Sequence, residues 1–299
     1  MNYFRCYNIE MMERKQFLKL SMRGTAGLGL LANSVSASQT LPRSHKIVGF
    51  NHLPEKNNST MKTVFHPANG RGHANHGWLD SHHSFSFANY YNPERMNFGV
   101  LRVLNDDQVA PGRGFGTHPH ENMEIISIPL EGDLEHKDSM GNAAVIKEGD
   151  VQVMSAGTGV YHSEYNKNKD REVKFLQIWM FPNQKNVEPR YGQISLEPEK
   201  LENRLEQILS PNPEDEGVWV HQNAWFHLGR FDALSKTEYQ LKDAANNGVY
   251  LFVLEGEIAV GDHTLKRRDA LGIWDTERFA VEINQAAQLL LMEIPLQLS

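Results

Sequence analysis

Short apolar runs separated by turn-forming clusters recur along the chain from Met61 onward. Three examples are GVLRVL at 99–104, IISI at 125–128 and KFLQIW at 174–179, and each lies between clusters rich in Gly, Asn or Asp. Runs of this length at short spacing, with few helix-length periodic segments between them, are typical of β-sandwiches and β-barrels. The pattern therefore predicts an all-β fold for this part of the chain.

One segment has helical periodicity instead. Residues 201–209 (LENRLEQIL) carry apolar side chains at positions i, i+4, i+7 and i+8, which is the spacing of one helix face. Pro211 and Pro213 follow and would end a helix there. We expect one short helix over 201–209.

A weak internal repeat relates the two halves of the strand-rich region. The tetrapeptide LEGD at 130–133 is echoed by LEGE at 254–257, and each follows an apolar run. Each is then followed by a turn and a further apolar strand, at 148–151 and at 267–271. A repeat of this size predicts two copies of one fold rather than a solenoid.

The N-terminal 60 residues have a different character. Segment 13–19 (ERKQFLK) is similar to a twin-arginine export motif, with Lys15 in place of the second arginine, and a Gly/Ala/Leu stretch and a small-residue site ending at Ala37 follow. We expect an export leader over 1–37 that directs the chain to the periplasm, and a polar linker over 38–60. The alternatives are an amphipathic N-terminal helix, or a cytoplasmic form that starts at Met61.

Length, charge and cysteine content narrow the function. A chain of 299 residues predicts two domains, which we place at 61–190 and 191–299. The net charge of −7 does not favour nucleic acid as a partner, and no run approaches the ~20 apolar residues of a membrane-spanning helix. Cys6 is the sole cysteine, so an intrachain disulfide and a multi-thiolate zinc site are excluded. Oligomeric state stays open, with a monomer as the default.

Two short motifs supply candidate metal ligands. His118 and His120 are two residues apart, as are His162 and Glu164, and residues at this spacing on a strand point to the same face. Three imidazoles and one carboxylate leave up to two positions of an octahedron open, which suits Fe(II), our preferred metal, and also Mn, Co, Ni or Cu, with zinc possible. Glu124 lies an even number of residues from His118 and His120, so on a continuous strand it would point to the same face. Spacing alone therefore does not decide whether Glu124 or Glu164 is the carboxylate ligand.

These motifs lie within a wider resemblance. Residues 112–124 and 149–166 resemble the two signature motifs of the cupins, and several segments resemble the pirin family in particular. Those segments are GHANHGWLDS at 72–81, FSFANYY at 85–91, GTHPH at 116–120, HKDSMGN at 136–142 and SAGTG at 155–159. The resemblance runs from about Met61 to the C-terminus. It implies two tandem cupin barrels with metal in the first, and it places the ligands at His118, His120, His162 and Glu164.

The same resemblance implies an activity. Bacterial pirin-like proteins include quercetin 2,3-dioxygenases, so we expect a metal-dependent dioxygenase that cleaves flavonols with O2, with Glu164 accepting a proton from a phenolic substrate. The alternative is a metal-bound redox sensor or regulatory binding protein without turnover.

The remaining histidines are not expected to bind metal. We interpret His73 and His76 as loop residues, and one of His82 and His83 as a candidate for the pocket mouth. His136, His221, His227 and His263 are interpreted as surface or structural. The second half has neither a His-x-His nor a His-x-Glu motif in the corresponding region, so we expect a metal-free barrel there.

Overall fold

The computed structural model describes residues 61–298, which belong to one compact unit. The predicted leader at 1–37 and linker at 38–60 lie outside the described residues. Within 61–298 the chain forms strands and two short 3-10 helices, η1 (Ala68–Gly70) and η2 (Pro198–Leu201), and no α-helix. No helix of this part is long and apolar enough to cross a membrane. The all-β prediction is confirmed.

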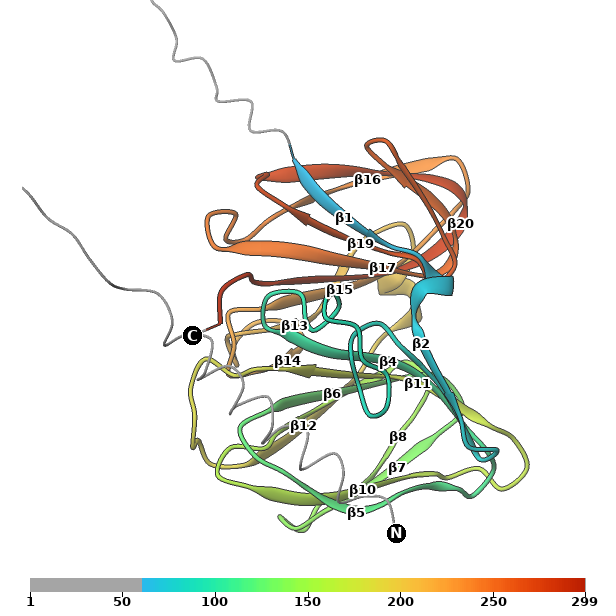
Figure 1. Ribbon diagram of the computed structural model, residues 1–299, viewed down its shortest axis with the longest axis vertical. Coiled ribbons are helices and arrows are strands. Elements are labelled where there is room, and N and C mark those ends of the chain that lie inside the picture. Colours follow the sequence, from blue (N-terminus) through green and yellow to red (C-terminus); the bar gives the residue numbers. More distant parts are fainter. Residues whose placement is uncertain (1–60, 299) are drawn as a thin grey trace, which may run out of the picture. The chain divides into compact units, whose positions relative to one another are not determined.

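The first barrel is built from two antiparallel sheets (Figure 1). Seven strands form the larger sheet, in the order β12 (Arg190–Ser195), β9 (Asp150–Ser155), β6 (Glu124–Glu131), β11 (Val173–Met180), β4 (Leu101–Val109), β3 (Leu79–His83) and β2 (Gly72–Asn75). Four strands form the smaller sheet, in the order β5 (Gly114–His120), β10 (Val160–Asn166), β7 (Leu134–Asp138) and β8 (Ala143–Ile146).

The second barrel is formed by one nine-stranded sheet. Its main path runs β1 (Lys62–His66), β19 (Ala270–Trp274), β17 (Asn247–Val260), β20 (Arg278–Pro295), β15 (Trp225–Phe231), β13 (Glu206–Ser210) and β14 (Val218–Trp219). β16 (Ser235–Gln240) pairs with β20, and β18 (His263–Lys266) pairs with β17. The pairing of β17 with β20 shifts register between Val253 and Ile258, so these long strands bend there.

The first strand of the described chain belongs to the second sheet. β1 pairs with β19 along its whole length, from Lys62 opposite Trp274 to His66 opposite Ala270. Figure 1 shows β1 among the strands of the C-terminal half, after which the chain passes through η1 to β2. The N-terminal strand therefore ties the two barrels together.

The interiors of the two barrels differ in chemistry. Between the larger sheet of the first barrel and strands β13, β15, β17 and β20 lies one shared apolar core, which includes Ile126, Leu176, Phe226 and Leu290. The interior of the second barrel is a separate apolar core. The interior of the first barrel instead holds buried polar side chains, among them Ser127, Gln152, His162, Glu164 and Gln177.

The internal repeat is visible in the structure of two turns. The Lys147 backbone N–H donates to Asp150 Oδ2 at 2.8 Å, and the Lys266 N–H donates to Asp269 Oδ2 at 2.9 Å. The residue before each aspartate has a positive φ, 86° at Gly149 and 68° at Arg268. Arg268 occupies this strained conformation while its Nε donates to Asp106 at 2.8 Å. The two turns are therefore copies of one motif.

The helix expected over 201–209 is wrong. η2 ends at Leu201, Asn203 has a φ of 55°, and Glu206–Ser210 forms β13. β13 pairs antiparallel with β15 and parallel with β14, so its backbone hydrogen bonds go to neighbouring strands. Sheet pairing and burial of Ile208 and Leu209 override the local helical spacing.

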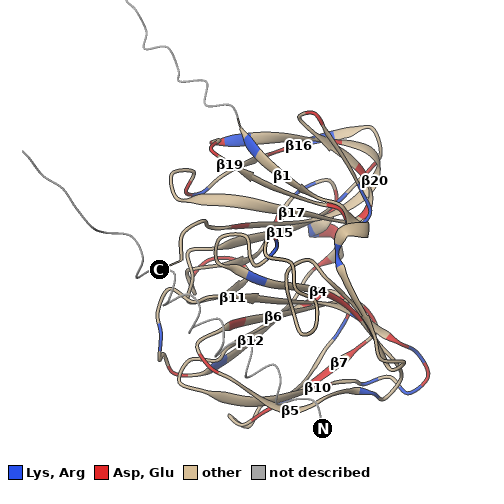
Figure 2. Ribbon diagram, in the orientation of Figure 1, with Lys and Arg blue, Asp and Glu red and all other residues tan. Residues whose placement is uncertain are grey.

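Charged residues are dispersed over the described part of the chain. Figure 2 shows Lys and Arg and Asp and Glu scattered over strands and loops, with no continuous basic run along any element. Both signs of charge are therefore interspersed over residues 61–298.

Candidate metal centre

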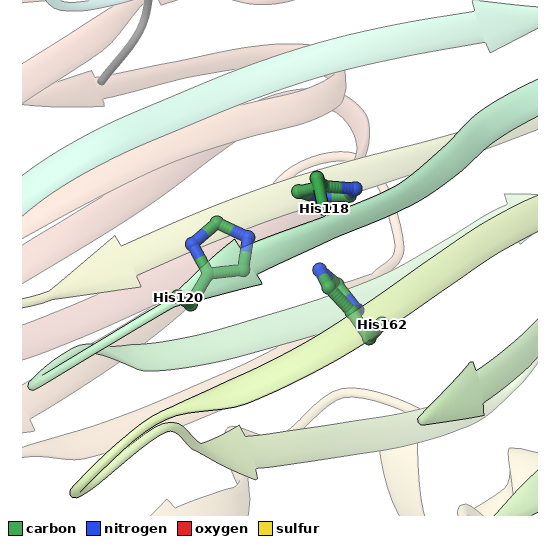
Figure 3. Close-up of side chains that lie close together, drawn as sticks. All are labelled: His118, His120 and His162. Carbon is green, nitrogen blue, oxygen red and sulfur yellow. The ribbon is translucent and has the colours of Figure 1, made fainter. Parts of the chain in front are cut away.

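Three imidazoles meet on the smaller sheet of the first barrel. His118 and His120 lie on β5, and His162 on β10 is the direct register partner of His118. Ring centroids are 4.4 Å apart for His118 and His162, and 4.9 Å apart for each of the other two pairs. One nitrogen from each ring lies within 4.8 Å of the other two. Figure 3 shows the three rings turned toward a common space.

Strand geometry explains this convergence. Side chains two residues apart on β5 point to one face, and the antiparallel pairing brings His162 to the same face of the next strand. The strands approach closely at Gly114, where an added Cβ would lie 2.2 Å from the Glu164 carbonyl oxygen. The register then shifts between His162 and Glu164, so Glu164 lies opposite Phe115.

The tautomer of His118 is fixed by its backbone partner. Nδ1 of His118 lies 2.8 Å from the carbonyl oxygen of Gly116. Because a carbonyl oxygen only accepts hydrogen bonds, Nδ1 carries the proton, and the lone pair of the neutral ring is on Nε2. This is the arrangement by which an outer partner orients a metal-binding histidine.

The other two rings have buried nitrogens without partners. His120 Nε2 and both ring nitrogens of His162 are buried and make no hydrogen bond. Burial lowers the pKa of His162 to about 2 and that of His120 well below its usual value, so both rings are neutral at pH 7. Buried polar groups normally have partners, and neutral imidazoles are the form that binds metals. The residues present therefore fit a bound transition-metal ion.

Glu164 lies beside this group without joining it. It forms a second, overlapping group of close ligand atoms with His162 and His136. Its carboxylate accepts hydrogen bonds from Ser127 Oγ at 2.9 Å and from Gln177 Nε2 at 2.7 Å, and the residue is 3% exposed. The structure thus brings three of the four predicted ligands together and holds the fourth against His162.

Glu124 is in neither group. Its Oε2 accepts a hydrogen bond from Ser155 Oγ at 2.7 Å, and burial raises the pKa of its carboxyl to about 7. The alternation of side-chain direction along β5 does not extend to Glu124, because β5 ends at His120 and a new strand, β6, begins at Glu124. Of the two carboxylates that spacing left open, Glu164 and not Glu124 therefore lies in a group with these histidines.

His136 lies beside the imidazole group, which the sequence did not lead us to expect. It is fully buried on β7, with Nε2 at 3.0 Å from Asp138 Oδ2 and its ring 5.4 Å from that of His162. Asp138 also accepts both the side-chain and backbone N–H of Asn142, which fixes the turn after β7. The HKDSMGN segment contained this signal, since it places a histidine two residues before an aspartate on the same strand face.

Aromatic rings flank the imidazoles. Trp179 packs edge to face on His120 at 4.8 Å, Tyr191 lies 5.0 Å from His136, and Phe87 lies 5.5 Å from Trp179. Trp179 Nε1 is buried without a partner. The imidazole group therefore lies against apolar and aromatic side chains.

Among residues 61–298, side chains that could bind a metal ion come together in groups of three only in the first barrel. The interior of the second barrel carries mainly apolar side chains, among them Val249 and Leu251 on β17 and Leu291 on β20. His227 and Glu293 are buried beside Tyr239 of this core, but neither belongs to a close group of three possible ligands.

Comparison with known proteins agrees with this architecture. Residues 64–180 match the Pirin family model, and residues 207–294 match that of the quercetinase C-terminal cupin domain. A quercetin 2,3-dioxygenase of Escherichia coli strain K12 is 42% identical over 228 residues, which cover 76% of this chain and 96% of the relative. A pirin-like protein of Caulobacter vibrioides is 36% identical over 229 residues, covering 76% of this chain and 97% of the relative.

A solved structure gives the same result at the level of fold. The crystal structure of a bacterial pirin from Escherichia coli in complex with nickel(II) has a TM-score of 0.74 and 39% identity, and the match covers 78% of this chain and 99% of that one. The two family models fall on the two barrels in chain order. The expected pair of cupin barrels is confirmed, and the chain belongs to the pirin family.

Proposed function

We propose that this protein is a metal-dependent dioxygenase that cleaves flavonols such as quercetin with O2. The observation that carries the proposal is the group of three imidazoles, His118, His120 and His162, whose nitrogens converge in the first barrel. The relative named quercetin 2,3-dioxygenase supports the reaction class. Fe(II) is the metal we favour, although the pirin that resembles this chain was crystallised with nickel(II).

The proposed chemistry divides between the metal and the chain. A bound divalent ion supplies Lewis acidity and open coordination positions at the three imidazoles. The chain supplies a proton acceptor, which we assign to Glu164. Ser127 and Gln177 hold the two oxygens of its carboxylate in place, so the group is fixed before substrate arrives.

The aromatic side chains beside the imidazoles suit a flat substrate. The rings of Trp179 and Phe87 are nearly perpendicular and together form one wall. Tyr191 lies next to His136. Flat phenolic molecules bind against apolar and aromatic walls, which also exclude water from the reacting atoms. We assign substrate orientation to these rings.

Oxygen uptake tests the proposal. Protein loaded separately with Fe, Mn, Co, Ni or Cu is mixed with quercetin under air, while O2 and the flavonol absorbance are followed. We expect both to fall together, and His118→Ala to abolish both. His263→Gln, in the second barrel, is the matched control and should retain activity.

The outcome also separates the enzyme from a sensor. If the loaded wild-type protein consumes neither O2 nor flavonol with any of these metals, the enzymatic proposal is refuted. A redox sensor would instead bind the metal and change between oxidation states without turnover.

A further inference from the structure

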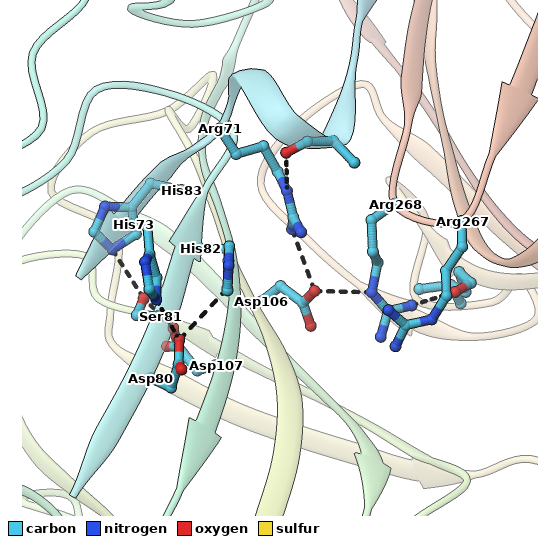
Figure 4. Close-up of polar contacts among 12 residues, drawn as sticks. Arg71, His73, Asp80, Ser81, His82, His83, Asp106, Asp107, Arg267 and Arg268 are labelled. Carbon is cyan, nitrogen blue, oxygen red and sulfur yellow. Dashed lines mark hydrogen bonds and ion pairs between the residues drawn. The ribbon is translucent and has the colours of Figure 1, made fainter. Parts of the chain in front are cut away.

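A second cluster of ligand-type side chains lies on the exposed hairpin of β2 and β3, away from the three imidazoles. His73 and His82 are direct register partners, and their rings stack with centroids 4.4 Å apart and 17° between planes. Asp80 Oδ1 lies 2.8 Å from His73 Nε2 and 3.6 Å from His82 Nδ1. Figure 4 shows both rings directed at this carboxylate.

We propose that His73, Asp80 and His82 form a second metal site, which binds a divalent transition cation such as Zn(II) or Cu(II). One ligand atom from each residue lies within 4.8 Å of the other two. Two imidazoles and a carboxylate are a common donor set for these ions. The site is independent of the proposed dioxygenase activity.

The distances match a coordination sphere. Two donors at ~2.0–2.1 Å from a four-coordinate zinc ion are ~3.3 Å from each other at the tetrahedral angle. The two observed distances to Asp80 Oδ1, 2.8 and 3.6 Å, lie on either side of this value. The two ring nitrogens lie within 4.8 Å of each other and the rings are stacked, so the rings must also turn toward a common point to admit the ion in place of the His73 hydrogen bond.

The ligands are held in place and remain accessible. Asn75 Nδ2 donates to Asp80 Oδ2 at 3.1 Å, which orients the carboxylate and leaves Oδ1 directed at the histidines. The side chains of His73, His82 and Asp80 are 52%, 40% and 37% exposed, so water can complete the sphere.

The neighbouring strand β4 fixes the position of this hairpin. β3 pairs with β4, where Asp106 is the register partner of His82 and forms ion pairs with Arg71 and Arg268 (Figure 4).

Metal counting tests this site. Metal-free wild-type chain, titrated with Zn(II) against a chromophoric chelator, should bind two equivalents. His73→Gln and His82→Gln should each weaken one equivalent by roughly 100-fold or more, beyond the ~10–100-fold loss typical of a group that only orients a ligand. His76→Gln, an exposed histidine at the turn of the same hairpin, is the matched control and should bind both.

A second measurement separates this site from the first. In a His118→Ala/His162→Ala background one equivalent should remain, and substoichiometric Cu(II) should broaden the ring resonances of His73 and His82 in NMR spectra. The same broadening is expected in the wild-type chain if the double variant does not fold. If His73→Gln and His82→Gln both bind as many equivalents as wild type with unchanged affinity, the proposal is overturned.

Discussion

Gly114 offers a way to disturb the metal centre without touching a ligand. Gly114 lies on β5 four residues before His118, and it pairs with Tyr165 on β10. A Cβ added there would lie 2.2 Å from the Glu164 carbonyl oxygen and 2.5 Å from the Tyr165 Cα. Both obstacles are backbone atoms, so no side chain can rotate away, and Gly114→Ala must push the two strands apart.

The size of the effect follows from these distances. An ordinary contact of a methyl carbon with a carbonyl oxygen needs about 1 Å more than the 2.2 Å available. We expect the substitution to cost about 1–3 kcal/mol of stability, the usual range for overpacking. A displacement of ~1 Å between donor groups is large for a site that must hold all its donors at one distance from an ion. A misplacement of this size costs about 100-fold in rate where reacting groups must be aligned, and we take a loss of the same order for metal affinity. We therefore expect metal affinity at the three imidazoles to fall by about 100-fold.

Gly116→Ala is the matched control for this test. It lies two residues along on the same strand, its added Cβ has 3.7 Å to the nearest neighbour, the Tyr165 hydroxyl, and its carbonyl still accepts from His118. Competitive metal titration of both variants measures the difference, with circular dichroism reporting the fold. Equal affinities for Gly114→Ala and Gly116→Ala would refute the reasoning that strand spacing sets the site.

Three further predictions concern charge and burial. Glu164→Gln should lower flavonol turnover by about 10²–10⁴-fold, as for loss of a general base; unchanged oxygen uptake would contradict this role. Glu293→Ala removes a fully buried acceptor of four hydrogen bonds, so the free energy of unfolding in urea should fall by about 3 kcal/mol or more, and an unchanged midpoint would contradict it. Burial lowers the pKa of His66 and of His227 to about 4, so below pH 6.5 the unfolded chain binds protons that the folded chain does not. Stability should be retained above pH 6.5 and lost toward pH 4, by up to about 3 kcal/mol per residue, and His227→Gln should flatten this profile of urea midpoints.

Much of the fold could be predicted because strand alternation and turn residues are local signals. The LEGD and LEGE tetrapeptides indicated two related halves, and Gly132 and Gly256 do have positive φ. The segment 201–209 could not be assigned in this way, since its conformation depends on pairing with β15, which lies later in the chain. Nor could the pairing of β1 with β19 be predicted, because the two strands are about 200 residues apart and carry no matching motif.

The candidate site was predictable to the extent that it depends on spacing. His118, His120 and His162 follow from i, i+2 geometry on two strands. The position of Glu164 depends on a register shift that no sequence pattern marks, and the burial of His136 depends on the packing of β7 beside β10. The group of His73, Asp80 and His82 could not be predicted without the cross-strand register. His73 and His82 are nine residues apart and become neighbours only when β2 and β3 pair.

Crystallography with anomalous scattering tests the central claim most directly. Protein crystals loaded with one divalent transition metal are measured on both sides of its absorption edge. The account predicts a peak ~2.0–2.2 Å from His118 Nε2 and from one nitrogen each of His120 and His162. The absence of any peak among these three imidazoles, in crystals that hold the metal elsewhere, would contradict it.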